Sequence, residues 1–250
     1  MKELKILIHG ATGRMGKAVR LCAARTKGVT PVCGVARIND FIDPVFPIYS
    51  SLTGVKEPFD VIIDFSSPQA ICGLTEFTVR HGVPTVICTT GLTDKDLKLI
   101  KTAAKAAPVF LCANASYGVA AMVKLVTLAA RLLSDFDAEI IETHHKNKAD
   151  APSGTALTLL RAIKSVSPEK TELFGRNARS GKRKKSEIGV HSIRGGTAVG
   201  EHTVEFLGEN EVISVTHRAD DRAVFAVGAI KAALYIADKT SGLYGMNDLI

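Results

Sequence analysis

The chain of 250 residues is long enough for one large domain or two modest ones with a hydrophobic core. Hydrophobic residues make up 46% of it and charged residues 23%, which is a globular profile and excludes an intrinsically disordered chain. Its apolar runs are too short to span a bilayer, and residues 1–10 lack the apolar segment of a signal peptide. We therefore expect a cytoplasmic protein that contacts no membrane.

The net charge is +7, and much of the excess comes from RNARSGKRKK at 176–185. Such a run is usually a solvated loop, although a positive field would also attract a polyanionic substrate, a phosphate-bearing cofactor or a nucleic acid. The five cysteines are scattered outside metal-ligand spacing. They predict buried thiols in a reducing compartment rather than disulfides, and we expect no metal site.

Short apolar runs alternate with helical patterns over the first 115 residues. The expected strands are LKILIHG (4–10), PVCGVA (31–36), FDVIIDF (59–65), PTVICTT (84–90) and PVFLCA (108–113). The expected helices are 14–28, 68–82 and 93–107, of which the first two end at a glycine. This alternation predicts a doubly wound parallel sheet of Rossmann type.

The pattern changes after residue 115. Residues 117–136 predict a long amphipathic helix, 138–144 a strand, and 154–166 a helix with Ser153 as a candidate N-cap. Residues 186–217 alternate with period two between glycine-rich turns, which predicts an antiparallel or mixed sheet. A last helix at 222–239 should pack back on the first domain. The predicted fold class is α/β: a Rossmann-type domain at 1–115, completed by 223–250, and an α+β domain at 116–222.

The motif GATGRMG at 10–16 lies where the first expected strand passes into the first expected helix. Glycines there let the backbone approach a pyrophosphate, and the helix N-terminus supplies oriented N–H groups. Thr12 stands where the stricter G-x-G-x-x-G fingerprint has its second glycine. The motif alone could mark a tight turn, but its position between a strand and a helix favours a dinucleotide site.

The end of the second expected strand bears on the choice of dinucleotide. NAD-selective sites place Asp or Glu there to bind the ribose 2′-hydroxyl. Here Ala36 is followed by Arg37, and the first acid is Asp40. A cation without the carboxylate favours NADPH, unless Arg37 is an ordinary surface arginine. Asp40 could also reach the ribose, which leaves NADH use open.

The segment ETHHKNKADAPSGTA (142–156) concentrates imidazoles and ammonium groups before a Ser-Gly-Thr turn. His144 and His145 end an expected strand, where neighbours point to opposite faces, so they are unsuited to share a metal ion. The segment also lacks the frame of a P-loop. What remains is either a polar loop with a capped helix or acids beside an anion-binding helix start, which would suit a carboxylate substrate that must be protonated.

These residues resemble the signature of the 4-hydroxy-tetrahydrodipicolinate reductase family, also called dihydrodipicolinate reductases, of the diaminopimelate route to lysine. The resemblance extends in order along nearly the whole chain, through GATGRMG, VIIDFSSP, TTG at 89–91, ANASYGV, HSIRGG, GEHTV, FAVGAIKAA and SGLYGM. It implies NADPH- or NADH-dependent reduction of 4-hydroxy-tetrahydrodipicolinate, a dianion, to tetrahydrodipicolinate with loss of water. It further implies a homotetramer, with 116–222 as the substrate-binding and tetramerisation domain.

The resemblance also implies roles for individual residues. His144 would be the proton donor or acceptor, and Lys148 a second proton donor. The substrate carboxylates would be bound by His145, Ser153, Gly154 and Thr155. The cofactor would be bound by Gly10, Ala11, Thr12, Gly13, Arg14, Met15, Arg37, Cys88, Thr89, Thr90, Cys112, Ala113, Asn114 and Ala115.

Three positions depart from the family pattern: Ala36 replaces the Glu of members that use NADH well, Cys88 replaces a glycine, and Ala115 a phenylalanine. The first favours NADPH, and the last would loosen one wall of the cofactor pocket. Two other functions stay open at this stage. One is a reductase of the same fold that acts on a different imino acid. The other is a cofactor-sensing nucleic-acid binder that uses residues 176–185, which predicts salt-sensitive binding to DNA or RNA. If the chain is a reductase, we expect no nucleic-acid partner.

Overall fold

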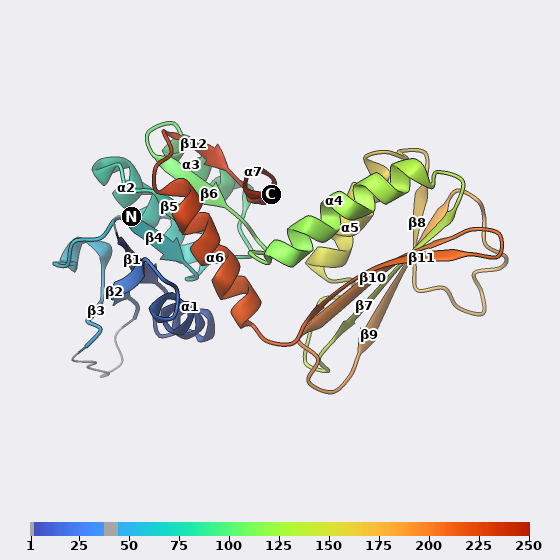
Figure 1. The fold of residues 1–250 in the computed structure, drawn as a ribbon, viewed down its shortest axis with the longest axis horizontal. Coiled ribbons are helices and arrows are strands. Elements are labelled where there is room, and N and C mark those ends of the chain that lie inside the picture. The colour runs from blue at the N-terminus through green and yellow to red at the C-terminus, as the bar shows by residue number, and fades with distance from the viewer. Residues whose placement is uncertain (1–2, 38–44) are drawn as a thin grey trace. The chain divides into compact units, whose positions relative to one another are not determined.

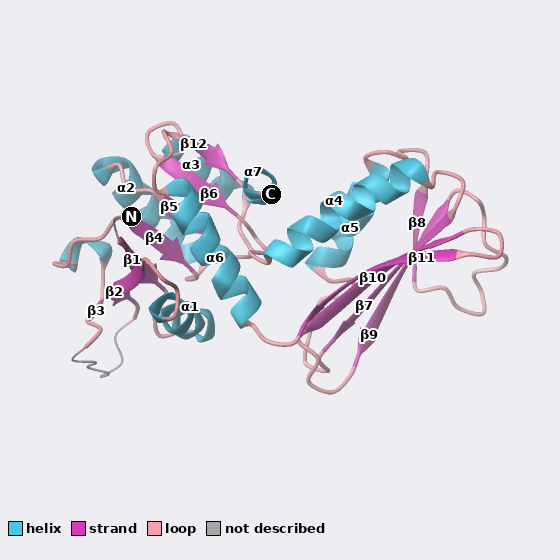
Figure 2. Cartoon of the chain, viewed as in Figure 1, coloured by secondary structure: helices cyan, strands magenta, loops and turns pink. Residues whose placement is uncertain are grey.

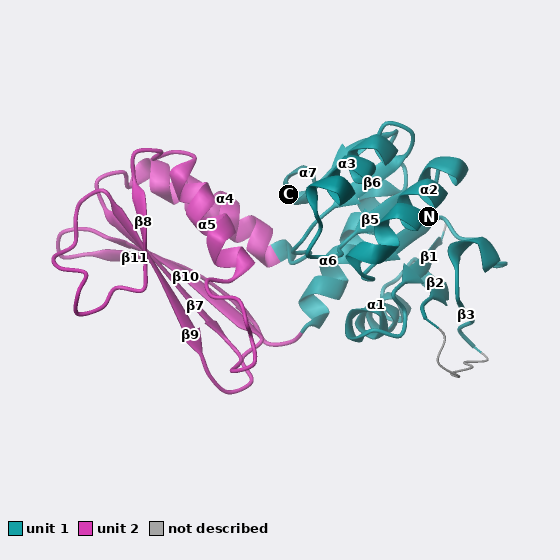
Figure 3. Cartoon of the chain, turned by 180° about the vertical axis from the view of Figure 1, so that it is seen from behind, with its two compact units in different colours: residues 1–117, 222–250 teal, residues 118–221 magenta. Residues whose placement is uncertain are grey.

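The computed structural model describes residues 3–37 and 45–250, which form two compact units (Figure 1, Figure 3). Unit 1 joins Met1–Tyr117 to Arg222–Ile250, and unit 2 is Gly118–Asp221. Unit 2 is therefore inserted into the sequence of unit 1. Each unit has a sheet and a hydrophobic core of its own.

Unit 1 is built on a parallel sheet with the strand order β12-β6-β5-β4-β1-β2-β3 in the described residues (Figure 2). The strands are β1 Leu4–His9, β2 Val29–Val35, β3 Ile48–Tyr49, β4 Val61–Asp64, β5 Thr85–Ile87, β6 Pro108–Leu111 and β12 Gly242–Tyr244. The helices are α1 Arg14–Ala24, α2 Ile71–His81, α3 Asp94–Ala103, α6 Ala223–Ile236 and α7 Met246–Leu249, with 3-10 turns η1 Leu52–Gly54 and η2 Pro68–Ala70. The predicted Rossmann-type fold is confirmed.

Helices cover both faces of this sheet, which is why its strands read as continuous apolar runs. In β1, Ile6 and Ile8 belong to the core that includes α1 and α6, while Leu7 packs on the other face with α2 and α3. The parallel strands bring the residues at their carboxyl ends to one edge of the sheet. His9 and Asp64 are paired there at the ends of β1 and β4.

Unit 2 has a mixed sheet with the strand order β11-β10-β7-β9-β8 in the described residues. Its strands are β7 Asp137–His144, β8 Thr171–Phe174, β9 Glu187–Arg194, β10 Gly200–Leu207 and β11 Val212–Ala219. Strand β10 runs antiparallel to β7 and β11, whereas β9 runs parallel to β7 and β8. Helices α4 (Tyr117–Leu132) and α5 (Gly154–Lys164) supply the rest of the core. The mixed sheet that the sequence predicts is confirmed.

The structure differs from the sequence-based prediction at short elements and element ends. Strand β2 begins at Val29, before the residues that we predicted, and α4 ends at Leu132. We did not predict β3, β8 or β12, because their residues are exposed or half-buried and lack the buried apolar run that marks the equally short β4, β5 and β6. Among the described residues, none of the helices combines the length and apolarity that crossing a bilayer requires.

Candidate active site

Strand β7 places two site residues on the same face as the core of unit 2. Its residues alternate between half-buried and buried, so that Glu142 and His144 follow Ala138 and Ile140 on the buried face. His145 lies beyond the last residue of the strand and is half-buried. Its side-chain direction is therefore not set by the strand, and our expectation that the two imidazoles face opposite ways stays a prediction.

Glu142 is fully buried, and hydrogen bonds from Arg194, His144, Ser153 and Ser192 meet at its carboxylate. Arg194 of β9 donates from both terminal nitrogens, at 2.7 and 2.8 Å. His144 Nδ1 lies 2.5 Å from Oε2, and the Ser153 N–H donates to Oε1 at 3.1 Å. Burial raises the pKa of Glu142, but these bonds, with Arg194 first among them, outweigh it and bring the pKa to about 2. Glu142 is thus ionised at neutral pH.

His144 is 9% exposed and is surrounded by charged groups. Burial lowers its pKa, as do the charges of Lys148 and Arg194, while the hydrogen bond and charge of Glu142 raise it. Its other nitrogen, Nε2, faces Gly200 of β10, where an added Cβ would lie 2.9 Å away. The ring of His202 stands edge-on to it with centroids 5.1 Å apart. Gly200 therefore leaves room beside the nitrogen that Glu142 does not occupy.

Helix α5 begins directly beside this imidazole. Ser153 is its N-cap, and its hydroxyl accepts from the Ala156 N–H at 3.1 Å and contacts His202 Nε2 at 2.9 Å. Gly154, the first residue of the helix, is exposed, and a Cβ added to it would meet no described atom within 4 Å. Thr155 is half-buried in the first turn. This helix start can accept an anion.

Lys148 supplies a cation on the loop between β7 and α5. Its ammonium group is 2.8 Å from the exposed carboxylate of Asp150, and its N–H donates to the His145 carbonyl at 3.1 Å. The structure thus brings together His144, Ser153 and the start of α5 around Glu142. We did not single out Glu142, Arg194 or His202 from the sequence, although E-x-H on a strand with period two could have paired Glu142 with His144.

The glycine motif of unit 1 forms a turn with no room for side chains. Gly10 has φ +83°, and a Cβ there would lie 2.5 Å from the Phe65 carbonyl oxygen. A Cβ on Gly16 would lie 2.3 Å from the Gly10 carbonyl oxygen. Gly13 is the N-cap of α1, which has no side-chain cap and no acid in its first turn. The backbone here can approach a pyrophosphate closely, which fits a dinucleotide. Ala11 is buried, Met15 half-buried, and Thr12 and Arg14 are exposed around this turn.

A buried carboxylate that we did not predict holds the edge of the sheet next to this turn. Asp64 accepts from the Thr89 hydroxyl at 2.7 Å and from the Ser66 N–H at 3.1 Å, and His9 Nδ1 lies 2.8 Å away. Since its proton is donated to Asp64, the Thr89 hydroxyl can only accept from a bound group. Thr90, the next residue, is exposed.

Several residues that we assigned to the cofactor have buried side chains. Cys88 and Cys112 lie in the core with their sulfur atoms 3.4 Å apart, and burial raises the pKa of the Cys88 thiol well above its ordinary value. Ala115 is also buried, and its carbonyl oxygen lies against Gly228 of α6. Asn114 accepts from the Ser116 N–H at 2.9 Å, and Ala113 is exposed.

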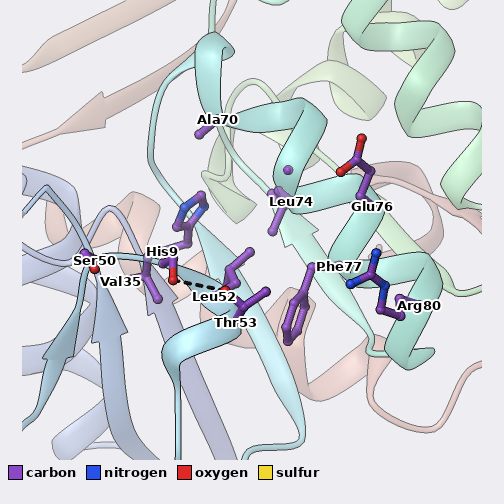
Figure 4. Close-up of a pocket in the computed structure, with 12 residues that line it drawn as sticks. His9, Val35, Ser50, Leu52, Thr53, Ala70, Leu74, Glu76, Phe77 and Arg80 are labelled. Atoms are coloured by element: carbon purple, nitrogen blue, oxygen red, sulfur yellow. Dashed lines mark hydrogen bonds between the residues drawn. The ribbon is translucent and has the colours of Figure 1, made fainter.

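A cavity of about 280 Å³ opens at the carboxyl ends of β1 and β2 (Figure 4). It is lined by His9, Val35, Leu52, Phe77 and Arg80, among others, from β1, β2, η1 and α2. Arg37 is exposed two residues after the end of β2, and Asp40 lies outside the described residues. The described residues contain no group of three or more His, Cys, Asp or Glu that could hold a metal ion.

The basic run is partly neutralised within unit 2. Arg183 is paired with Asp137 at 2.6 Å and Glu139 at 3.1 Å, and Arg176 donates to Glu187. Two of the cations that would bind a nucleic acid are therefore already paired with acidic side chains of unit 2.

Known proteins resemble the chain over its whole length. The family models "Dihydrodipicolinate reductase, N-terminus" and "Dihydrodipicolinate reductase, C-terminus" match residues 4–115 and 118–250. The 4-hydroxy-tetrahydrodipicolinate reductase of Caldanaerobacter subterraneus subsp. tengcongensis is 46% identical over 248 residues, 99% of this chain and 98% of that protein. That of Campylobacter jejuni subsp. jejuni is 41% identical over 250 residues, 99% of each chain.

A solved structure agrees with these relatives. The dipicolinate-bound dihydrodipicolinate reductase from Paenisporosarcina sp. TG-14 matches with a TM-score of 0.84 and 25% identity over 100% of both chains. The DAP dehydrogenase of C. glutamicum, at a TM-score of 0.60 and 14% identity over 98% of this chain and 93% of that one, shares the fold alone. None of these matches supports the nucleic-acid-binding alternative.

Proposed function

Because the chain belongs to the 4-hydroxy-tetrahydrodipicolinate reductase family, we propose that it reduces 4-hydroxy-tetrahydrodipicolinate to tetrahydrodipicolinate with loss of water, in the diaminopimelate route to lysine. Its Rossmann-type domain is of the kind that binds a nicotinamide dinucleotide. The observation that carries the proposal in the structure is that the imidazole of His144 and the N-cap of α5 share the carboxylate of Glu142, next to a loop that bears Lys148.

The substrate is a dianion, and the start of α5 suits one of its carboxylates. The N–H groups at Gly154 and Thr155 carry the positive end of the helix dipole, and Ser153 fixes the turn through its N-cap bond. His145 and Lys148 add groups that donate to the second carboxylate. Lys148 is held by Asp150 at 2.8 Å, and a substrate carboxylate can take the place of that exposed acid.

His144 and Lys148 are the proposed proton donors. Reduction of a conjugated imine builds negative charge on the substrate, which a positioned acid must neutralise. His144 Nε2 faces Gly200, a position without a side chain, and the side chain of Lys148 supplies an ammonium group on the loop between β7 and α5. Loss of the hydroxyl group as water needs a proton on the leaving oxygen and releases one from the neighbouring carbon, and the second acid can supply the first of these.

The turn at Gly10 and the start of α1 would hold the cofactor pyrophosphate, and the Thr89 hydroxyl would accept from the nicotinamide ribose. When bound, a reduced nicotinamide supplies the hydride. We propose that NADPH is preferred and that NADH is also accepted. The reason is that Ala36 and Arg37 follow β2, and neither of these two described residues is the acid that binds the ribose 2′-hydroxyl in NAD-selective sites.

We further propose a cytoplasmic homotetramer assembled through residues 116–222. Helices α4 and α5 pack on one face of the unit 2 sheet, and the other face carries the exposed side chains Ile193 and Val212. Exposed apolar side chains on a sheet face are suited to burial against a second copy. Light scattering of the purified protein should give four times the mass of one chain, and the mass of a single chain would contradict this part of the proposal.

The reaction is tested by following the oxidation of NADPH and NADH with the condensation product of pyruvate and aspartate semialdehyde. We expect oxidation only when this substrate is present. His144→Gln and Lys148→Ala should each lose most turnover while they still bind cofactor, and Lys146→Ala, at an exposed position on the same loop, should keep it. Unchanged turnover in both site variants would refute the assigned roles.

Cofactor choice is tested separately with Arg37→Ala. We expect weaker NADPH binding and unchanged NADH binding, because only NADPH carries the 2′-phosphate. Arg25→Ala is the matched control, since Arg25 is exposed at the opposite end of α1 from the glycine turn. NADH used several times better than NADPH by the unaltered enzyme would show that the interpretation of Ala36 and Arg37 is wrong.

A further inference from the structure

A single buried carboxylate connects the proposed acid to the proposed substrate-binding turn. We propose that Glu142 is a positioning residue, which fixes His144 with Nε2 as its reactive nitrogen and sets the place of the α5 start beside it. The inference rests on the proposed function, since it assigns the proton to one atom of His144. Glu142 itself is fully buried and touches neither the substrate nor the cofactor in this account.

The protonation of His144 follows from what Glu142 can accept. An ionised carboxylate has no proton to donate, so the hydrogen bond at 2.5 Å requires the proton to be on Nδ1. This holds for both the neutral and the charged imidazole. Nε2 is then the only nitrogen that gains or loses a proton, and it faces Gly200, where no side chain blocks it.

Arg194 keeps Glu142 in the ionised form. Its two hydrogen bonds occupy both carboxylate oxygens, at 2.7 and 2.8 Å, from the neighbouring strand. With a pKa of about 2, Glu142 does not take the proton of His144 at neutral pH. The carboxylate therefore orients the imidazole and stabilises its charged form, as an acceptor that stays ionised throughout.

The same carboxylate also fixes the start of α5. Its Oε1 accepts from the Ser153 N–H at 3.1 Å, and the Ser153 hydroxyl caps the helix and contacts His202 Nε2 at 2.9 Å. The acid and the anion-binding turn thus share one anchor. Without Glu142, neither the ring of His144 nor the backbone at Ser153 would keep its partner.

The charge of Glu142 also increases the fraction of His144 that is protonated, because it raises the pKa of the imidazole. The charged or titratable groups around the ring are Glu142 on β7, Arg194 on β9, Lys148 with Asp150 on the loop, and His202 on β10. Glu142 raises the pKa of His144, whereas Lys148, Arg194 and burial lower it. Removal of the negative charge should therefore move the loss of activity at high pH toward lower pH.

The experiment compares kcat/KM against pH for the unaltered enzyme, Glu142→Gln and Glu139→Gln. Glu139 is a matched control, because it lies on the other face of β7 and is also bonded to an arginine and a histidine, Arg183 and His191. For Glu142→Gln we expect a loss of about 100-fold at neutral pH, within the range of general acid catalysis, and a decline that begins at lower pH. Glu142→Asp should restore the pH dependence, and Glu139→Gln should leave both rate and profile unchanged.

A loss in Glu142→Gln that is uniform at all pH values, or that Glu139→Gln reproduces, would overturn the proposal. Nitrogen NMR of the unaltered protein with labelled histidine covers the case in which Glu142→Gln does not fold. The His144 signals, assigned by their loss in His144→Gln, should show a protonated Nδ1 in the neutral ring, and a protonated Nε2 would refute the inference. An inactive unaltered enzyme would instead refute the proposed function, and a fully active His144→Gln would refute the role of His144 on which this inference depends.

Discussion

Replacement of Arg194 by methionine should lower the free energy of unfolding, because it leaves the buried charge of Glu142 without its arginine partner. Arg194 is 19% exposed and Glu142 is fully buried, so the variant leaves a carboxylate without its main partner. The fall of the Glu142 pKa from 4.5 to about 2 corresponds to roughly 3 kcal/mol of stability at neutral pH. Arg194 is the first of the hydrogen-bond partners behind this fall, and His144, Ser192 and Ser153 contribute the rest. Breaking a buried ion pair typically costs about 3–5 kcal/mol, so we expect Arg194→Met to lose roughly 3 kcal/mol.

The stability difference between the unaltered protein and Arg194→Met should depend on pH in a definite direction. A carboxylate whose pKa is lowered by folding stabilises the protein fully above pH 4.5, and that contribution is lost as the pH falls through about 2. The difference between the unaltered protein and Arg194→Met should therefore be largest at neutral pH and smaller by roughly 1 kcal/mol at about pH 4. A difference that grows on acidification would refute this reasoning.

Urea unfolding at both pH values measures the difference. The chain has no tryptophan, and its four tyrosines lie outside unit 2, so circular dichroism or hydrogen exchange of β7 and β10 must report the transition. Arg218→Met is the control, because Arg218 is 69% exposed and its partners among the described residues, Glu201 and Asp220, have side chains that are 43% and 78% exposed. It should change stability by less than about 1 kcal/mol. An equal loss in both variants would contradict the account of Glu142.

Three further outcomes are expected. Gly10→Ala should bind the cofactor more weakly in calorimetry. Gly28 has a similar φ, but a Cβ added there would meet nothing within 4 Å, so Gly28→Ala should keep its cofactor affinity and lose about 1–2 kcal/mol of stability. Equal cofactor affinities in the two variants would contradict this account. Gly200→Ala should lower kcat, since its Cβ would press on His144 Nε2, and normal kcat would argue against that placement. Burial, and then the charge of His144, lower the pKa of His202 to about 4. On NMR titration His202 should therefore stay neutral down to about pH 5, and the stability that it contributes should be lost as the pH falls from 6.5 toward 4. Titration of His202 near pH 6.5 would refute its burial.

Long buried elements were predictable from the sequence because apolar runs and helical spacing reflect which faces are covered. Strand β1 is an example, since helices on both faces require an uninterrupted apolar run. The motif that follows β7 was also informative, because its residues are close together in the chain. Ser153 caps α5 as expected.

The partners of these residues could not be predicted, because only the sheet brings them together. Strand pairing places Arg194 beside His144 and His202 beside Glu142, across gaps of about fifty and sixty residues in the chain. A single sequence does not specify which strands are neighbours. The contact between Cys88 and Cys112 has the same origin, since each follows one of the paired strands β5 and β6.

We propose above all that the chain reduces a dicarboxylate imine with His144 as an acid. The most direct measurement is the rate of NADPH oxidation by the unaltered enzyme and by His144→Gln, with and without the condensation product of pyruvate and aspartate semialdehyde. We predict oxidation only with that substrate, and a rate in His144→Gln that is lower by about 100-fold or more with cofactor binding intact. Equal rates in the two proteins, or oxidation that does not depend on the substrate, would contradict the claim.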